Sequence, residues 1–348
     1  MNLADLDAIK TPSLGARFRR LPPIVFVPPL AAAVYPFLLW AFHKVVGPPG
    51  FSPAPWRVSE AALLLVAMLA VPALGMICAA RGASGPSIRR LAYASVMAPT
   101  LYVFLGVLQS MARSPVPDEL VWCVAWSGVT MWAMASAGAK QATSSAVDLG
   151  RWRVAHGIAG AVILFFVLFH LGNHLFGLIG PAAHAAVMNV GRKVYRAPLI
   201  EPLLVLAMLF QIASGFYLAW RWSDVPVGFH RLFQVASGFY LSAYVLGHMN
   251  SVFIYARTYL HIPTDWAFAT GAPTGLIHDP WNIRLLPHYA LGVFFVLTHL
   301  ASGLRVVLIA HGVDEAITNQ IWAFGAAVSA VIAVAIMAGM CGVRISLA

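Results

Sequence analysis

The fold is decided by the stretch AHGIAGAVILFFVLFHLGNHLFGLIGP, from Ala155 to Pro181, which places three histidines in an apolar run long enough to cross a membrane. His156 and His170 lie on one face of the predicted helix, since fourteen residues at 100° and about 1.5 Å per residue bring the chain back to the same side about 21 Å further on. An imidazole in hydrocarbon is costly without a partner, so His170, deep in the run, is a candidate functional residue. His156 lies near the end of the run, where a position at the water interface is equally consistent.

The composition indicates a polytopic membrane protein built entirely of helices. Of 348 residues, 60% are hydrophobic and only 10% are charged. The first apolar segment contains five prolines between positions 22 and 36, which favours a kinked or partly interfacial helix. About nine stretches are long enough to span the bilayer, near residues 21–43, 58–80, 91–111, 119–139, 154–179, 200–220, 230–256, 286–310 and 318–341.

The distribution of positive charge predicts the orientation of the chain. The net charge is +10, but the basic residues lie between the spans, which argues against a nucleic-acid partner and for the lipid bilayer. Of the 22 Lys and Arg residues, 13 lie on the side of the amino terminus and 9 on the other. We therefore expect a cytoplasmic amino terminus in a bacterial inner membrane. The tail contributes most of this bias, through Lys10, Arg17, Arg19 and Arg20.

The cysteines and glycines exclude several cofactors. Cys78, Cys123 and Cys341 are isolated within apolar spans, so the chain has no CxxCH motif for covalent haem and no four-cysteine set for an iron–sulfur cluster. The sequence also lacks a dinucleotide-binding or phosphate-loop motif. Any haem must be held non-covalently, and a flavin or nicotinamide site would belong to another chain.

The histidines divide the chain into two regions. Only His43 falls in the first four spans, and the other eleven histidines lie between His156 and His311. We expect residues 1–150 to form a four-helix region without haem ligands that contacts a partner or packs in lipid, and residues 151–348 to form a five-helix haem-binding bundle. The stretch RLAYASVMAPTLYVFLGV from Arg90 is similar to RLFQVASGFYLSAYVLGH from Arg231. This similarity indicates either a degenerate internal repeat or the shared composition of aromatic membrane helices.

Two deep histidines on different spans are suited to hold a b-type haem. His170 and His248 each lie beyond the midpoint of their span in the outward direction, so their depths match. His299 lies near the centre of the eighth span, whereas His288 and His311 lie near its ends and are expected to be wet. Glycines that would allow close approach of a flat macrocycle, or simple helix packing, accompany the ligands at Gly172, Gly238 and Gly247.

At these residues the chain resembles the membrane-anchor cytochrome b subunit of succinate:quinone oxidoreductases and fumarate reductases, the five-helix type with two haems. The resemblance runs from about Arg151 to the end of the chain and rests on the stretches FHLGNHLFG, YRAPLIEP, QIASGFYLAW, SGFYLSAYVLGH and THLASGL. It implies that His170 and His248 hold the distal haem. It also implies that His299 is one ligand of the proximal haem.

The sixth span departs from the family pattern, because Gln211 stands where the second proximal histidine is expected. A carboxamide is a poor ligand for haem iron, so the proximal haem could be absent, bound through His299 alone, or completed by another histidine such as His156. Counting residues from the span ends separates His156 from His299 by about 15 to 20 Å in depth. The sequence therefore predicts one secure haem b.

The leading hypothesis is a haem-b membrane subunit that passes electrons between a quinone pool and a partner redox protein, as part of a quinone-linked oxidoreductase complex. One alternative is a stand-alone transmembrane haem reductase, which requires two well-ligated haems. The other is a non-redox scaffold or transporter, in which the histidines form hydrogen-bonded networks or a proton path.

A quinone site is predicted where the sixth span begins. Glu201 lies there near Arg196 and Tyr195, on the same side as His170 and His248. The Glu201 carboxylate could handle quinol protons, although pairing with Arg196 is the favoured interpretation. Two long connections, 180–199 and 258–285, are expected to fold over this end, and Trp266 and Trp281 of the second could form an interfacial belt or receive a quinone head group.

Overall fold

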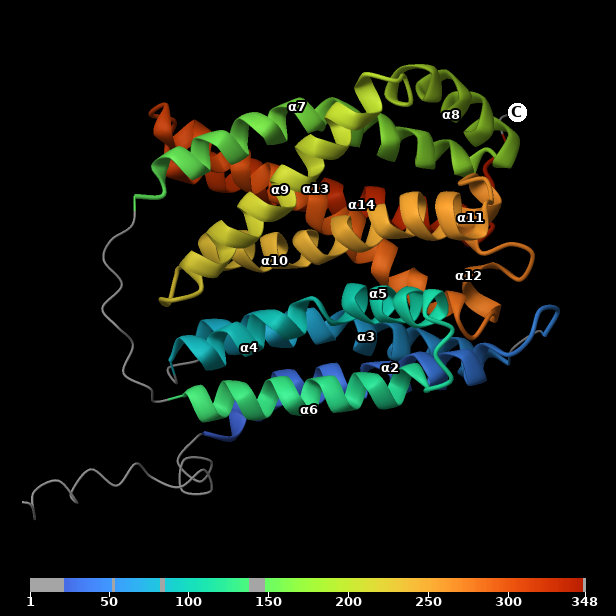
Figure 1. Cartoon of the computed structure of the whole chain (residues 1–348), viewed down its shortest axis with the longest axis horizontal. Coiled ribbons are helices and arrows are strands. Elements are labelled where there is room, and N and C mark those ends of the chain that lie inside the picture. Colours follow the sequence, from blue (N-terminus) through green and yellow to red (C-terminus); the bar gives the residue numbers. More distant parts are fainter. Residues whose placement is uncertain (1–21, 52–53, 82–84, 138–147, 347–348) are drawn as a thin grey trace, which may run out of the picture.

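The computed structural model describes residues 22–51, 54–81, 85–137 and 148–346, and these residues form a bundle of thirteen α-helices. Most of the long helices run roughly along the long axis of the molecule (Figure 1). The amino-terminal helices are α2 (Val27–Val46), α3 (Pro55–Arg81), α4 (Pro86–Val96), α5 (Ala98–Met111) and α6 (Asp118–Ser136). The basic residues of the amino-terminal tail, which carry the predicted orientation, lie outside the described residues.

The carboxy-terminal region begins with α7 (Gly150–Leu175) and the short η3 (Phe176–Leu178). It continues through α8 (Pro181–Tyr195), α9 (Ile200–Trp222) and α10 (Phe229–Met249), which runs on as the π-helix η4 (Asn250–Leu260). Two short helices, α11 (Trp266–Thr270) and α12 (Gly275–His278), and the turn η5 (Asn282–Arg284) precede α13 (Leu285–Ala310) and α14 (Glu315–Met340).

The chain is a polytopic helical membrane protein. Among the described residues, six helices are long and apolar enough to cross a bilayer, and the bent pair α4 and α5 would make a seventh. The described residues therefore contain fewer such helices than the nine spans predicted from the sequence. The remaining two predicted spans coincide with α6 and α10, which do not meet the same test of length and hydropathy.

The position of α10 explains its lower hydropathy. This helix packs against α3, α4, α5, α9 and α13, so it lies at the centre of the bundle. Val235, Ala236 and Tyr240 on it are at most 1% exposed, and the hydroxyls of Ser237 and Ser242 bond to carbonyl groups of their own helix. A helix surrounded by protein can carry polar residues that a lipid-facing helix would not tolerate.

Prolines shape two of the predicted spans. The first begins with the 3-10 turn η2 (Pro23–Phe26) and continues as α2 with Pro36 inside it, so the proline-rich segment is helical over residues 23–46. The third is broken at Met97, where α4 and α5 meet at an angle of 69°. Pro99 lacks an N–H and its ring conflicts with the carbonyl of Ser95, which accounts for the bend.

The amino-terminal and carboxy-terminal regions are joined by polar contacts as well as by a shared core. The partly buried ion pair between Arg284 and Asp118 (2.6 Å) links η5 to α6. Gly106 leaves the space for it, because a Cβ there would collide with the Arg284 guanidinium. At the other end of the bundle, Arg89 donates to the carbonyl oxygens of Ser223 (3.1 Å) and Asp224 (2.8 Å).

The two long connections lie at one end of the bundle, where α8, α11 and α12 gather (Figure 1). The Asp265 carboxylate caps α11 by accepting from the Phe268 N–H (3.1 Å). Arg192 and Arg196 of the first connection donate to the Thr264 carbonyl and hydroxyl of the second. The connections are therefore bound to each other at this end.

Candidate functional site

The structure brings His170 of α7 and His248 of α10 together. Their ring centroids are 6.0 Å apart and the ring planes are inclined by 67°. His170 stacks on Phe166 (5.5 Å between centroids), and His248 lies parallel to Tyr244 (5.8 Å, 5°). This is the histidine pair that the sequence selected.

A second pair is formed by His156 of α7 and His299 of α13. Their ring centroids are 6.4 Å apart, with the planes nearly perpendicular at 84°. The depth estimate that separated these residues by about 15 to 20 Å is therefore wrong. It assumed that all spans start and end at common levels, whereas α13 continues for eleven residues beyond His299 and α7 begins only six residues before His156.

Both separations suit an iron held between two imidazoles. With a metal–nitrogen bond of about 2.0–2.1 Å, as for zinc, and a ring nitrogen about 1.1 Å from its centroid, two imidazoles sharing one ion have centroids about 6.3 Å apart. The helices leave room beside the rings. α7 packs closely against α9 and α14 but not against α10 or α13, and all four histidines are half-buried residues.

Two buried serines fix the orientation of the second pair. The Ser214 hydroxyl donates to the Phe210 carbonyl (2.6 Å), so its oxygen accepts from Nδ1–H of His156 (2.8 Å). In the same way, the Ser237 hydroxyl donates to the Gln234 carbonyl (3.1 Å) and accepts from Nδ1–H of His299 (2.8 Å). We infer from these networks that Nε2 of His299 carries the lone pair that can bind a metal, and that Nε2 of His156 carries it when the Ser214 oxygen accepts from Nδ1–H.

Gln211 supports the helix that carries His156. In the orientation that satisfies both ends of its carboxamide, Gln211 donates to the His156 carbonyl (3.0 Å) and accepts from the Gly160 N–H (3.2 Å), and its nitrogen also lies 3.0 Å from His156 Nδ1, where it competes with the Ser214 contact. The position that the family pattern gives to a ligand on α9 therefore contacts the α7 backbone beside another histidine.

The predicted glycines have different surroundings. A Cβ at Gly172 would meet open space, and a Cβ at Gly238 would approach the His299 ring to 3.6 Å. Gly247 instead faces the Phe104 side chain of α5, at 3.5 Å from a Cβ, so it serves helix packing. Gly215, which the sequence analysis did not single out, lies against the His156 ring, at 3.1 Å from a Cβ.

A polar cluster missed by the sequence analysis adjoins the first pair. His174 lies one turn after His170, with ring centroids 4.8 Å apart, and its ring is 5.2 Å from that of His184 on α8. Asn173 Nδ2 donates to His184 Nε2 (3.1 Å). Burial lowers the pKa of His184, the Arg192 charge lowers it further and Asp265 opposes the shift, so the imidazole is neutral near pH 7.

Several buried polar atoms of this cluster have no hydrogen-bond partner within the described part of the chain. They are Nδ1 of His174, Nδ1 of His184, Oδ1 of Asn173 and Nε of Arg192. Buried polar groups are normally satisfied, so four such atoms in one place make this cluster a candidate for contact with a polar group of a ligand. The spacing of His170 and His174, one helical turn apart, was the sequence signal for this cluster.

The three residues predicted to bind quinone have other partners. Glu201 pairs with Arg257 of η4 (2.5 Å), so the expected pairing with Arg196 is wrong. Arg196 bonds to the Thr264 hydroxyl (2.8 Å), and burial together with the charges of Arg192 and Arg257 lowers its pKa. Tyr195 packs against Phe166, with centroids 5.5 Å apart.

The expectation that His288 is wet is also wrong. Its side chain is 3% exposed, and its ring lies 4.6 Å from that of Tyr244. Nδ1 of His288 is another buried atom without a hydrogen-bond partner in the described residues. His311, the other histidine expected to be wet, is exposed.

Comparisons with family models, curated proteins and solved structures found no match to this chain. Within the described ranges, no group of three or more His, Cys, Asp or Glu side chains could hold a bare metal ion. The donor sets are instead pairs of imidazoles. Two imidazoles are a sufficient protein ligand set for a haem, because the macrocycle provides the other ligands of its iron.

Proposed function

We propose that this protein is a haem-b membrane subunit that carries electrons between a quinone pool and a partner redox protein. The proposal rests on the two imidazole pairs, since the separation within each pair suits a shared iron. The first pair is His170 with His248 and the second is His156 with His299. Their positions on α7 are about 21 Å apart along the helix. A haem at each level would let electrons cross the bundle in two stages.

In this proposal the second haem is complete, with its ligand provided by α7 instead of α9. His156 takes the role that the resemblance to cytochrome b anchor subunits gives to the position of Gln211. The serine contacts at Nδ1 support it, because ligand imidazoles ordinarily donate their other N–H to a fixed acceptor. The proposal therefore replaces the expectation of one haem with two.

Hydrogen-bond donors near each pair suit the carboxylates of a haem. Near the first pair, the unpartnered His184 Nδ1 and Arg192 Nε are donors of this kind. Near the second, a small cavity of about 110 Å³ is lined by residues that include Arg231, Ser302 and Arg305. Arg305 lies six residues after His299 on α13, a rise of about 9 Å.

When bound, a haem b supplies a one-electron couple at its iron. The protein would contribute the imidazoles of His170, His248, His156 and His299 as ligands, with Ser214 and Ser237 positioned at Nδ1 of the second pair and polar donors beside the first. We further propose that α6, at the edge of the bundle, and α10, at its centre, also cross the bilayer, giving nine crossings with a cytoplasmic amino terminus in a bacterial inner membrane. The amino-terminal helices then serve contact with the partner or with lipid.

A stand-alone transmembrane haem reductase is the second candidate. The objection from sequence was the missing proximal ligand, and the proximity of His156 and His299 removes it. Affinity purification from native membranes separates the two functions. A redox subunit that copurifies in a fixed ratio supports the first, and a protein that reduces an external acceptor alone supports the second.

The test of the proposal is an optical difference spectrum, dithionite-reduced against oxidised, with the haem-to-protein ratio. We expect two low-spin haems b per chain. His156→Ala should leave one low-spin haem, and Gln211→His in the His156→Ala background should restore the second if the α9 position can replace the α7 ligand. A spectrum without haem would leave a scaffold or transporter with hydrogen-bonded histidines.

A further inference from the structure

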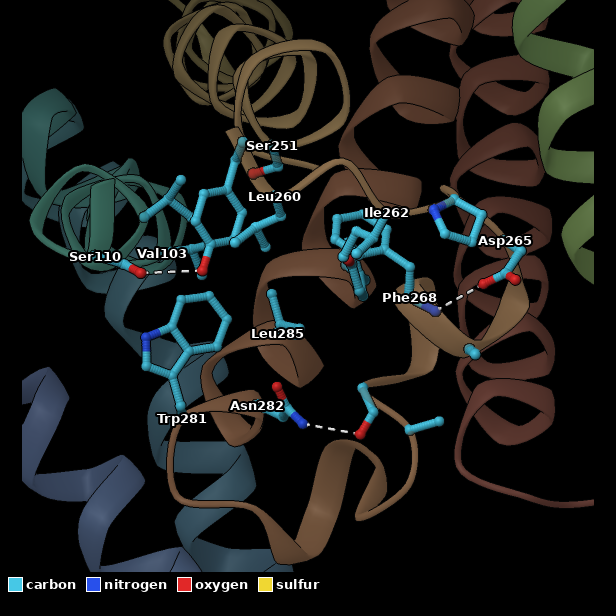
Figure 2. A pocket seen from close by; sticks show the side chains of 17 residues that line it. Val103, Ser110, Ser251, Leu260, Ile262, Asp265, Phe268, Trp281, Asn282 and Leu285 are labelled. Atoms are coloured by element: carbon cyan, nitrogen blue, oxygen red, sulfur yellow. Dashed lines mark hydrogen bonds between the residues drawn. The ribbon is translucent and has the colours of Figure 1, made fainter. Parts of the chain in front are cut away.

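A cavity of about 520 Å³ lies between the two regions of the chain, away from the imidazole pairs. Figure 2 shows Val103 and Ser110 of α5 with Trp281 on one side, Ile262 and Phe268 on the other, and Leu285 between them. Its size falls within the usual range of small-molecule sites, about 300–1,000 Å³. Helix α5 of the amino-terminal region therefore forms one wall of a site that the carboxy-terminal region completes.

The lining combines apolar and aromatic surface with a few polar groups. The hydroxyls of Ser110 and Tyr255 bond to each other across the two regions (3.0 Å). Asn282 Nδ2 donates to the Gly271 carbonyl (3.1 Å), which holds the loop that forms the floor (Figure 2). Ser251 and Asp265 add further oxygen atoms. Such a lining suits a flat ring with polar oxygens better than a bare acyl chain.

The cavity is connected to the first imidazole pair by a series of ring contacts. Tyr289 lines the cavity, and its ring lies 5.2 Å from that of His288. The His288 ring is 4.6 Å from Tyr244, which stacks on His248 at 5.8 Å. A ligand beside Tyr289 is thus in continuous aromatic contact with a proposed iron ligand, through buried side chains that include the unpartnered His288 Nδ1.

We infer that this cavity binds the head group of a quinone, with α5 forming part of the site. The choice of quinone rests on the proposed function, whereas the existence of a ligand site rests on the cavity and its lining. Glu201, Arg196 and Tyr195, the quinone residues expected from the sequence, do not line it. The inference gives the amino-terminal helices a role in binding the substrate.

The test measures equilibrium binding of a tritium-labelled benzoquinone with one isoprenyl unit, and of the corresponding naphthoquinone, to the purified full-length protein. Ala267 lines the cavity and is exposed, so Ala267→Trp fills the space without entering the core. Ala186→Trp on α8 is the matched control, because Ala186 is also exposed but does not line the cavity. We expect at least tenfold weaker binding for Ala267→Trp and unchanged binding for Ala186→Trp.

A second measurement on the unaltered chain covers the case in which Ala267→Trp fails to fold. A photoreactive azidoquinone should label peptides from residues 98–111 or 251–289, and labelling confined to residues 195–201 overturns the inference. Equal quinone binding by both tryptophan variants overturns it as well, as does a copurified phospholipid that Ala267→Trp displaces while no quinone binds.

The haem spectrum tests the proposed electron-transfer function independently of the quinone site. If quinone binding depends on the cavity but no haem is present, the site stands and the electron-transfer role fails. If two haems are present but the quinone does not bind in the cavity, the inference alone fails.

Discussion

Removing the Ser214 hydroxyl tests whether His156 is positioned as an iron ligand. Ser214 is 0% exposed and its oxygen is 2.8 Å from His156 Nδ1, so Ser214→Ala leaves a buried N–H without its acceptor. Such a loss costs about 1–3 kcal/mol. If this free energy destabilises only the haem-bound state, the Kd for haem at the second pair rises about 5- to 140-fold, since 1.4 kcal/mol corresponds to a factor of ten.

The Gln211 side chain determines how large the rise in the Kd for haem is in Ser214→Ala. Its carboxamide nitrogen lies 3.0 Å from His156 Nδ1, so a turn of the amide would bring its oxygen into the position of an acceptor. We expect Ser214→Ala alone to lie at the lower end of the range. The double variant Ser214→Ala with Gln211→Leu should lie at the upper end.

The assay is titration of haem-depleted protein with haem, followed by absorbance of the low-spin band. Ser329→Ala on α14 is the matched control, because Ser329 is 2% exposed and its hydroxyl donates to the Gly325 carbonyl of its own helix (2.6 Å), with no other side-chain partner among the described residues. Equal haem affinity and spectra in Ser214→Ala, the double variant and the control would refute the positioning role.

Three further outcomes are expected. His170→Ala or His248→Ala should each abolish one low-spin α-band while the His156 and His299 site keeps its own; unchanged spectra in both contradict the pairing. Glu201→Gln and Arg257→Gln should each lower the free energy of unfolding by less than about 1 kcal/mol, because the ion pair is partly exposed. Quinol oxidation should be unchanged in both variants. Loss of quinol oxidation in Glu201→Gln alone would indicate that this carboxylate handles protons. The lowered pKa of His184 means that the unfolded chain takes up a proton first as the pH falls below about 6.5, so stability decreases there; His184→Gln should reduce the fall in Tm between pH 7 and 5.5, and an identical fall contradicts the assignment.

What the sequence predicted well was local to single helices. The shared face of His156 and His170 follows from helix geometry alone, and the structure directs each ring toward a histidine of a neighbouring helix. The helical membrane class likewise follows from composition. Neither inference requires knowledge of how helices are placed relative to one another.

What the sequence could not predict depends on relations between helices. The levels of His156 and His299 are set by where α7 begins and where α13 ends, which residue counts from apolar boundaries do not give. Glu201 pairs with Arg257, which is 56 residues away, in preference to nearby Arg196. The cavity wall from α5 could not be predicted, because it brings together segments about 150 residues apart along the chain.

One uninterrupted helix, α7, contributes a histidine to both imidazole pairs, and this makes the interval between them a property of chain length. A single inserted residue between His156 and His170 would turn one ring by about 100° and shift it by about 1.5 Å, removing it from its partner. Seven inserted residues would nearly restore the direction but add about 10 Å to the interval. Point substitutions can adjust the surroundings of either pair, but the distance between the pairs can change only by insertions or deletions of whole turns.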